Sequence, residues 1–278
     1  MSGCTTPATC SASPATDSDE EALLRMNSAT VRNLLVRGML AGLAAGLAAL
    51  VVAYFLGEPR VDQAIAFEEA HAHEHGGEEL VSRTLQSTAG LSTGVLVYGV
   101  AFGGIAALAY CFALGRIGRF GPRASALLLA AAGLVCVYVV PFLKYPANPP
   151  AVGDPDTLNQ RTALFFLMIV LSVLLAIGTV ILGKRLAPRL GNWNATVAAG
   201  AFFVLAVGLA YAFLPSFSEV PEHFPAGLLW QYRLAALAVQ VTLWTSFGLV
   251  FGLLAERLLA PRTAAEKAAA ARPAPVAH

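Results

Sequence analysis

Three histidines fall within five residues of this 278-residue chain, and carboxylates flank them on both sides. The segment reads Ala66-Phe-Glu-Glu-Ala-His-Ala-His-Glu-His-Gly-Gly-Glu-Glu79. Imidazole nitrogens and carboxylate oxygens together form the ligand set of borderline divalent ions such as Co²⁺, Ni²⁺ and Zn²⁺. We therefore predict a metal site formed by His71, His73, His75, Glu74, Glu78 and Glu79.

Either backbone conformation of this segment brings imidazoles together. In a helix, His71 and His75 share a face with Glu68, whereas in an extended segment all three histidines lie on one side. The alternative is a polar loop that titrates near pH 6.5, roughly the ordinary pKa of histidine, and binds no specific ion. Ligand type does not identify the metal, because affinity at such a site rises from cobalt through nickel to copper.

Long apolar runs must position this segment. Six stretches of at least twenty residues lack any charged side chain: 38–57, 84–115, 124–143, 162–183, 190–218 and 234–255. A helix rises about 1.5 Å per residue, so about 20 residues cross a hydrocarbon core about 30 Å thick. Apolar residues make up 57% of the chain and charged residues 13%, which would leave a soluble protein with large apolar patches. We predict an all-α, polytopic membrane protein, a bundle of six transmembrane helices.

Basic residues gather in alternate loops, as the positive-inside rule expects of a membrane protein. With the N-terminus in the cytoplasm, thirteen of the eighteen basic residues fall on the cytoplasmic side. Eleven of the seventeen acidic residues and four of the five histidines fall on the outer side. We therefore expect both termini to be cytoplasmic and the histidine-rich segment to face outward.

The two ends of the chain differ from its apolar centre. Residues 1–30 are rich in Ser, Thr, Pro and Ala, and we predict a disordered N-terminal tail there. A second disordered tail is predicted for the Ala-rich residues 260–278, which leaves an integral membrane domain at 31–259.

Two patterns suggest how the helices pair. An arginine stands near the start of each returning helix, at Arg83, Arg161 and Arg233, which indicates three hairpins in series. Each arginine is expected to reach the headgroups or to pair with a loop carboxylate. Glycines also recur four residues apart, at Gly38/Gly42/Gly46, Gly90/Gly94, Gly99/Gly103 and Gly248/Gly252. Close contact over small residues drives helix association in lipid, so we expect these glycines to mark internal packing.

Two outer loops are rich in proline, which fixes φ and ends helices. One holds five prolines between Pro141 and Pro155, and the other carries Glu222 and His223 between Leu214 and Arg233. We predict stiff caps that shape an ion entrance, or that anchor in the interface through Trp and Tyr. No Asp, Glu, Lys, Arg or His lies deep in any apolar run, which argues against an intramembrane enzyme or a proton-coupled pump.

The segments PFLKYPANPPAVGDPDTLNQRT and FPAGLLWQYRLAALAVQVTLW, with the histidine-rich loop, resemble the predicted cobalt transporter subunit family CbtA. The resemblance covers roughly residues 31–259. It implies a multi-pass protein of the bacterial inner membrane, linked to cobalt supply for cobalamin synthesis. It also implies a small single-span partner, CbtB, with its own histidine-rich tail. Members are described with about five spans, one fewer than the six apolar runs of this chain.

We therefore expect a membrane subunit of a divalent-metal transporter, with cobalt as the expected ion, which captures the ion at the outer loop and conducts it inward. It is expected to hold no permanent cofactor and to be no enzyme. The alternative is a metal-binding scaffold or assembly partner without transport activity of its own. The last-ranked alternative is an enzyme that acts on lipid through Glu222, His223 and Arg233. It ranks last because the sequence shows no acid and base at a spacing typical of a catalytic pair.

Overall fold

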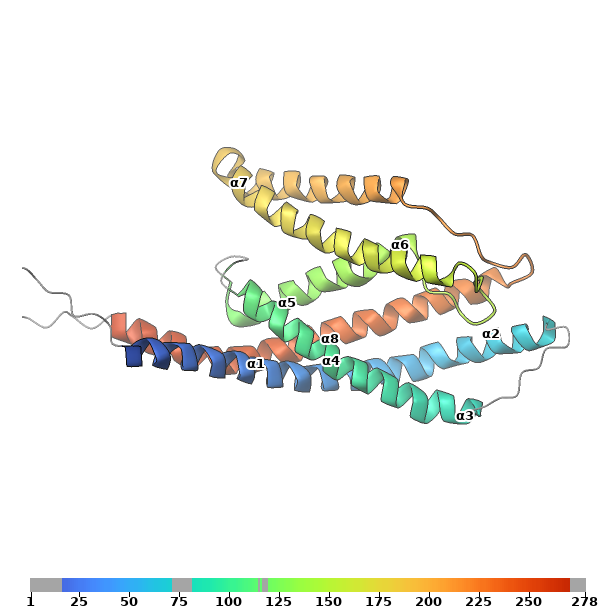
Figure 1. The fold of residues 1–278 in the computed structure, drawn as a ribbon, viewed down its shortest axis with the longest axis horizontal. Coiled ribbons are helices and arrows are strands. Elements are labelled where there is room, and N and C mark those ends of the chain that lie inside the picture. Colours follow the sequence, from blue (N-terminus) through green and yellow to red (C-terminus); the bar gives the residue numbers. More distant parts are fainter. Residues whose placement is uncertain (1–16, 72–81, 115, 117–119, 271–278) are drawn as a thin grey trace, which may run out of the picture.

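The computed structural model describes residues 17–71, 82–114, 116 and 120–270, and every regular element in these ranges is a helix (Figure 1). Five helices are long and apolar enough to cross a membrane: Ser28–Ala70, Arg83–Ala113, Pro122–Lys144, Leu158–Phe213 and Ala226–Leu259. These helices confirm the predicted all-α membrane class. Six spans and cytoplasmic termini stay predictions.

The first two long helices are joined by the histidine-rich segment. Helix α1 (Asp17–Val52) continues through the π-helical turn η1 (Ala53–Gly57) into α2 (Glu58–His71). The second begins with α3 (Arg83–Leu85), passes through the π-helical turn η2 (Gln86–Gly90) and continues as α4 (Leu91–Ala113). Figure 1 shows α2 and α3 at one end of the molecule, while the start of α1 lies at the other.

The third long helix and the last pack with the first two. The third consists of α5 (Pro122–Gly133), the π-helical turn η3 (Leu134–Val139) and α6 (Val140–Lys144). The last, α8 (Ala226–Ala270), packs against both α1 and α5. Its C-terminal end lies beside the start of α1 in Figure 1, so both described ends of the chain share one end of the bundle.

Helix α7 (Leu158–Phe213) contains two of the six predicted apolar runs. A straight helix of 56 residues would be about 84 Å long, far more than a bilayer needs. The helix is interrupted at Gly191, where φ is 74° and ψ is 162°, a conformation that glycine adopts without strain. The chain reverses there (Figure 1), and Gly183 of one arm faces the Cβ of Ala199 of the other.

Helices α1 and α4 approach each other so closely that only glycine fits between them. A Cβ added to Gly42 would lie 2.8 Å from the Cα of Gly103 and closer still to the carbonyl oxygen of Gly99. A Cβ added to Gly99 would lie 2.7 Å from the carbonyl oxygen of Gly42. The predicted packing role is confirmed for these glycines. Among the described residues, nothing lies within 4 Å of a Cβ added to Gly94, which takes no part in this interface.

Aromatic rings fill the interior between α4, α5 and α8. The ring of Phe102 lies edge to face with those of Trp244 and Phe247, at centroid distances of 4.6 Å and 5.1 Å. Phe247 stacks on Phe251 at 5.2 Å, and the indole of Trp244 packs directly on Gly133, where a Cβ would overlap it. This part of the described bundle is therefore a packed core.

The α7 hairpin is attached mainly through η3 and α6. The Ser172 hydroxyl donates to the carbonyl of Cys136 in η3, and the Tyr211 hydroxyl donates to the carbonyl of Val140. Lipid offers no hydrogen-bond donors, so both hydroxyls are satisfied within the protein and tie the hairpin to this helix. Met168 and Val207, one from each arm, are buried in the same cluster as Val140.

The described helices extend past the predicted membrane domain at both ends. Helix α1 begins at Asp17, inside the segment predicted as a tail, and α8 continues to Ala270. The division into tails of 1–30 and 260–278 and a domain of 31–259 stays a prediction.

Replacing Gly42 with alanine is expected to destabilise the protein, because the new methyl group would meet backbone atoms of α4 that cannot move alone. We expect a loss of about 1–3 kcal/mol, the usual cost of overpacking. Thermal unfolding in detergent, followed by intrinsic fluorescence, measures it. Gly94→Ala is the matched control, and equal unfolding temperatures for the two variants would show that the α1–α4 contact does not need glycine.

Candidate functional site

The predicted metal-binding segment leaves the bundle at the end of α2. His71 is the last residue of that helix, one turn beyond Glu68. The other five predicted ligands lie outside the described residues: His73, Glu74, His75, Glu78 and Glu79. In the described ranges, no three His, Cys, Asp or Glu side chains come together in a group that could hold a metal ion. The six-residue metal site therefore stays a prediction.

A small apolar cluster fixes the end of α2 against two other parts of the chain. Ala64 is fully buried against Val152, Phe224 and Leu228, and the ring of Phe67 meets that of Phe224 edge to face at 5.0 Å. Val152 lies in the cap segment, which we define as residues 145–157, and Phe224 lies in the return loop, residues 214–225. Three segments far apart in sequence therefore meet where the histidine-rich segment begins.

An ion-pair cluster ties together the helices on either side of that segment. Arg83, the first residue of α3, pairs with Glu58 and with Asp62, both on α2. The distance from the Arg83 Nε to the Asp62 Oδ1 is 2.9 Å. Arg83 follows the histidine-rich segment in the chain, and the two carboxylates precede it. The ion pairs therefore hold together the two helices that this segment connects.

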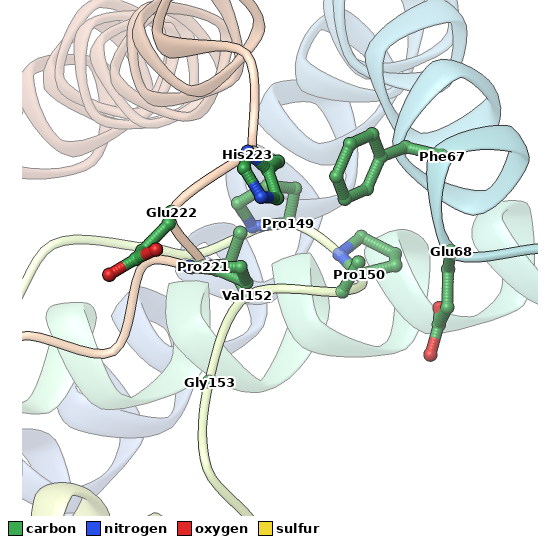
Figure 2. A pocket seen from close by; sticks show the side chains of 10 residues that line it. Phe67, Glu68, Pro149, Pro150, Val152, Gly153, Pro221, Glu222 and His223 are labelled. Carbon is green, nitrogen blue, oxygen red and sulfur yellow. The ribbon is translucent and has the colours of Figure 1, made fainter. Parts of the chain in front are cut away.

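An open recess of about 540 Å³ lies beside the end of α2 (Figure 2). It is lined by Phe67 and Glu68 from α2, by Pro149, Pro150, Ala151, Val152 and Gly153 from the cap segment, and by Pro221, Glu222 and His223 from the return loop. Proline holds both loops in fixed conformations, so the walls are stiff. Among the described residues, no Lys or Arg lines this recess.

The polar side chains of the recess do not converge on one point. Figure 2 shows the imidazole of His223 on the side toward Phe67, whereas the carboxylates of Glu222 and Glu68 extend in different directions. All three polar residues are exposed. Two carboxylates at a concave surface raise the local concentration of cations, but this geometry encloses no ion. The recess is therefore an open, acidic surface and not an enclosed ion site.

Hydrogen bonds from the cap side hold the return loop in place. The ammonium of Lys144 donates to the carbonyl of Tyr211 at 2.9 Å and to the hydroxyl of Ser216 at 2.7 Å. The phenol of Tyr145 donates to the carbonyl of Pro215 at 2.9 Å. Burial raises the pKa of the Tyr145 phenol, which keeps it a neutral donor.

Glu219 is the central acceptor between the return loop and the cap segment. Its carboxylate accepts hydrogen bonds from the Arg161 guanidinium at 2.5 Å, from the Thr157 hydroxyl, and from the backbone N–H of Asp154 at 3.4 Å. The Glu219 side chain is 8% exposed and that of Arg161 is 23% exposed. Three hydrogen-bond donors thus replace the water that an exposed carboxylate would hold.

The three arginines at the starts of returning helices have different partners. Arg83 and Arg161 pair with carboxylates, which is one of the two roles expected for these arginines. Arg233 instead donates to the carbonyl of Ala147 and the side-chain oxygen of Asn148.

The residues of the enzyme hypothesis are not brought together. Arg233 lines a second, smaller pocket, whereas Glu222 and His223 line the recess.

Sequence reasoning pointed to Glu222 and His223 but assigned no role to Phe67, Phe224 or Glu219. The apolar spacing of Ala64 and Phe67, three residues apart on α2, was a usable signal that one face of α2 is buried. Nothing in the sequence pairs Glu219 with Arg161, because the two residues are 58 positions apart and Glu219 lies in an irregular loop.

The apolar helices define a multi-pass α-helical membrane protein whose loops line a recess with two carboxylates at one end. The chain belongs to the family of the probable cobalt transporter subunit (CbtA), whose model matches residues 31–256. The resemblance found in the sequence is thereby confirmed. No curated protein and no solved structure matches the chain. Family membership implies a role in cobalt transport, and the term subunit implies a partner in a transporter complex.

Replacing Glu219 with glutamine is expected to loosen the return loop while keeping the size of the side chain. Loss of the charge weakens hydrogen bonds worth about 2 kcal/mol, which corresponds to roughly thirtyfold faster opening. Hydrogen exchange of the amides of residues 216–224 measures this change. Glu222→Gln is the matched control, since that side chain is exposed. Equal exchange in both variants would contradict the role of Glu219.

Proposed function

We propose that this chain is the membrane subunit of a cobalt transporter that captures Co²⁺ at its histidine-rich loop and conducts it inward. The loop leaves α2 one turn beyond Glu68, at a recess that also carries Glu222 and His223. This placement carries the proposal, because an ion released by the loop would meet a recess whose described lining holds two carboxylates and no Lys or Arg.

The proposed ligands are the imidazoles of His71, His73 and His75 with the carboxylates of Glu74, Glu78 and Glu79. Nitrogen and oxygen ligands of this kind suit Co²⁺ and its neighbours, and the family membership favours cobalt among them. A short loop with several ligands raises the local concentration of the ion at the entrance. The ion is cargo, and the proposal includes no resident cofactor and no catalytic residue.

The proposed topology has six spans with both termini in the cytoplasm of a bacterium, in the inner membrane. The two arms of α7 support six spans, since the reversal at Gly191 gives each arm enough length to cross the bilayer. Lys184, Arg185 and Arg189 lie near this reversal, which favours a cytoplasmic turn. The cap segment, the return loop and the histidine-rich segment then share the outer side.

The proposed partner is a small single-span subunit of the CbtB type with a histidine-rich tail. It is proposed from the family resemblance, together with the family description of the chain as a subunit.

The membrane potential supplies enough energy for inward movement without ATP. It contributes about 2.3 kcal/mol per charge per 100 mV, or about 4.6 kcal/mol for a divalent cation. At about 1.4 kcal/mol per tenfold, this exceeds a thousandfold accumulation.

A scaffold that binds metal but does not transport it alone is the second candidate. The packed core around Trp244 and Phe102 supports it, because no charged residue is buried in the described interior. A dehydrated divalent ion needs charged ligands to cross lipid.

Cobalt uptake into proteoliposomes is expected to fall when His71, His73 and His75 are all replaced with alanine. We expect at least a tenfold loss at ion concentrations below saturation and a smaller loss at saturation, because the loop acts by concentrating the ion. Radioactive cobalt taken up by vesicles with an imposed inside-negative potential measures the effect, and calorimetry measures binding to the same proteins.

His278→Ala is the matched control, since it removes one imidazole outside the loop. Uptake that is the same in the triple variant and in wild type would refute the role of the loop. Binding by wild type without any uptake would favour the scaffold.

Single cysteines in a cysteine-free variant are expected to report the topology. His73→Cys and Ser216→Cys should react with an impermeant maleimide on intact cells, because both are proposed to lie outside. Asn192→Cys, next to the reversal in α7, should react only after the membrane is permeabilised. Labelling of intact cells at residue 192 would contradict six spans, and protection of residue 73 would contradict capture at the outer face.

A further inference from the structure

A second pocket, of about 40 Å³, lies where the cap segment, the return loop, α7 and α8 meet. It is lined by Lys144, Tyr145, Pro146, Asn148, Arg161, Phe217, Glu219, Val220 and Arg233. Three of these side chains are cationic and only one is anionic, so the lining carries a formal charge of +2.

The single carboxylate of this pocket, that of Glu219, already has hydrogen-bond donors around it. Glu219 accepts hydrogen bonds from Arg161, Thr157 and the backbone of Asp154, and its side chain is almost fully buried. Glu219 thereby neutralises the charge of Arg161. The charges of Lys144 and Arg233 are not neutralised by a carboxylate of this pocket.

Lys144 and Arg233 have only neutral partners among the described residues. Lys144 donates to the Tyr211 carbonyl and the Ser216 hydroxyl, and Arg233 donates to the Ala147 carbonyl and the Asn148 side chain. An ammonium has three N–H donors and a guanidinium has five, so both side chains retain donors beyond these bonds. Two part-buried cations without a counterion are costly unless an anion joins them.

The size of the pocket limits the ligand to a small group. A cavity needs roughly 10–15 Å³ to hold one water, so this pocket has room for about three oxygens of a ligand whose other atoms lie at its open side. The guanidinium fork of arginine matches the oxygens of a phosphate group, and a lysine ammonium adds a point charge.

We propose that this pocket binds a phosphate group, through Lys144 and Arg233. The pocket lies at the C-terminal end of α6, close to the N-terminal ends of α7 and α8, where spans end and lipid headgroups begin. The phosphate comes from a phospholipid headgroup or from free phosphate, which present the same oxygens.

Bound phosphate would hold the cap segment and the return loop together. Asn148 and Val220 line this pocket, while the neighbouring Pro149 and Pro221 line the recess. The two loops therefore separate a basic pocket from an acidic recess. The inference does not depend on cobalt transport, since the phosphate site is built from a different set of side chains.

Binding to the purified, delipidated full-length protein without metal tests the proposal. Inorganic phosphate is titrated against chloride at matched ionic strength, and phosphatidylglycerol is added in separate mixed micelles. The unfolding temperature and native mass spectrometry report binding. We expect Arg233→Gln and Lys144→Gln each to weaken binding by roughly tenfold, about 1.4 kcal/mol. Arg60→Gln, which removes one charge from α2 outside both pockets, should not change it.

Stabilisation of wild type by phosphatidylglycerol alone, lost in the pocket variants, would support the site and name lipid as the source. Stabilisation by inorganic phosphate, lost in the same variants, would support the site with free phosphate as a ligand. Equal effects of phosphate and chloride on wild type, without retained lipid, would overturn the proposal even if both pocket variants fail to fold. So would binding by folded pocket variants as tight as by Arg60→Gln.

Discussion

The glycine contact between α1 and α4 is the interaction on which the functional end of this protein depends. Lipid tails are as apolar as leucine, so apolar surface alone does not pull helices together in a bilayer. Gly42 and Gly103 instead let two backbones touch, and that contact sets the relative position of both helices. Because α1 continues into α2 and α4 follows α3, the same contact positions the two helices between which the histidine-rich segment runs. The pairing of Arg83 with Glu58 and Asp62 then fixes them closer to that segment.

Irregular loops and the helix ends beside them together create the chemistry of this end. The cap segment and the return loop are held by Lys144, Tyr145 and Glu219, whose bonds reach positions 58 to 72 residues away. On one side these loops line a recess with two carboxylates and an imidazole, and on the other a pocket with a net positive charge. Charges of opposite sign are thus separated by two short stretches of chain. Stiff proline-rich backbone makes such a separation possible, because a flexible loop would let the charges pair.

The packed interior constrains any route for an ion. Trp244 fills the space that a side chain at Gly133 would occupy, and Phe102 and Phe247 surround it. A passage through this core would require these rings to move.

Apolar length and charge distribution determined the class of this protein from the sequence, because a bilayer demands uncharged helices of a minimum length whatever their neighbours are. The glycine spacing at Gly38, Gly42 and Gly46 likewise identified a packing face, and the loop motifs identified the family. Only the tertiary structure decided that Gly191 reverses α7, that Glu219 pairs with Arg161, and that the end of α2, where the histidine-rich segment begins, lines a recess. Those contacts join residues far apart along irregular loops. No local periodicity encodes them, since they depend on where several helix ends meet in space.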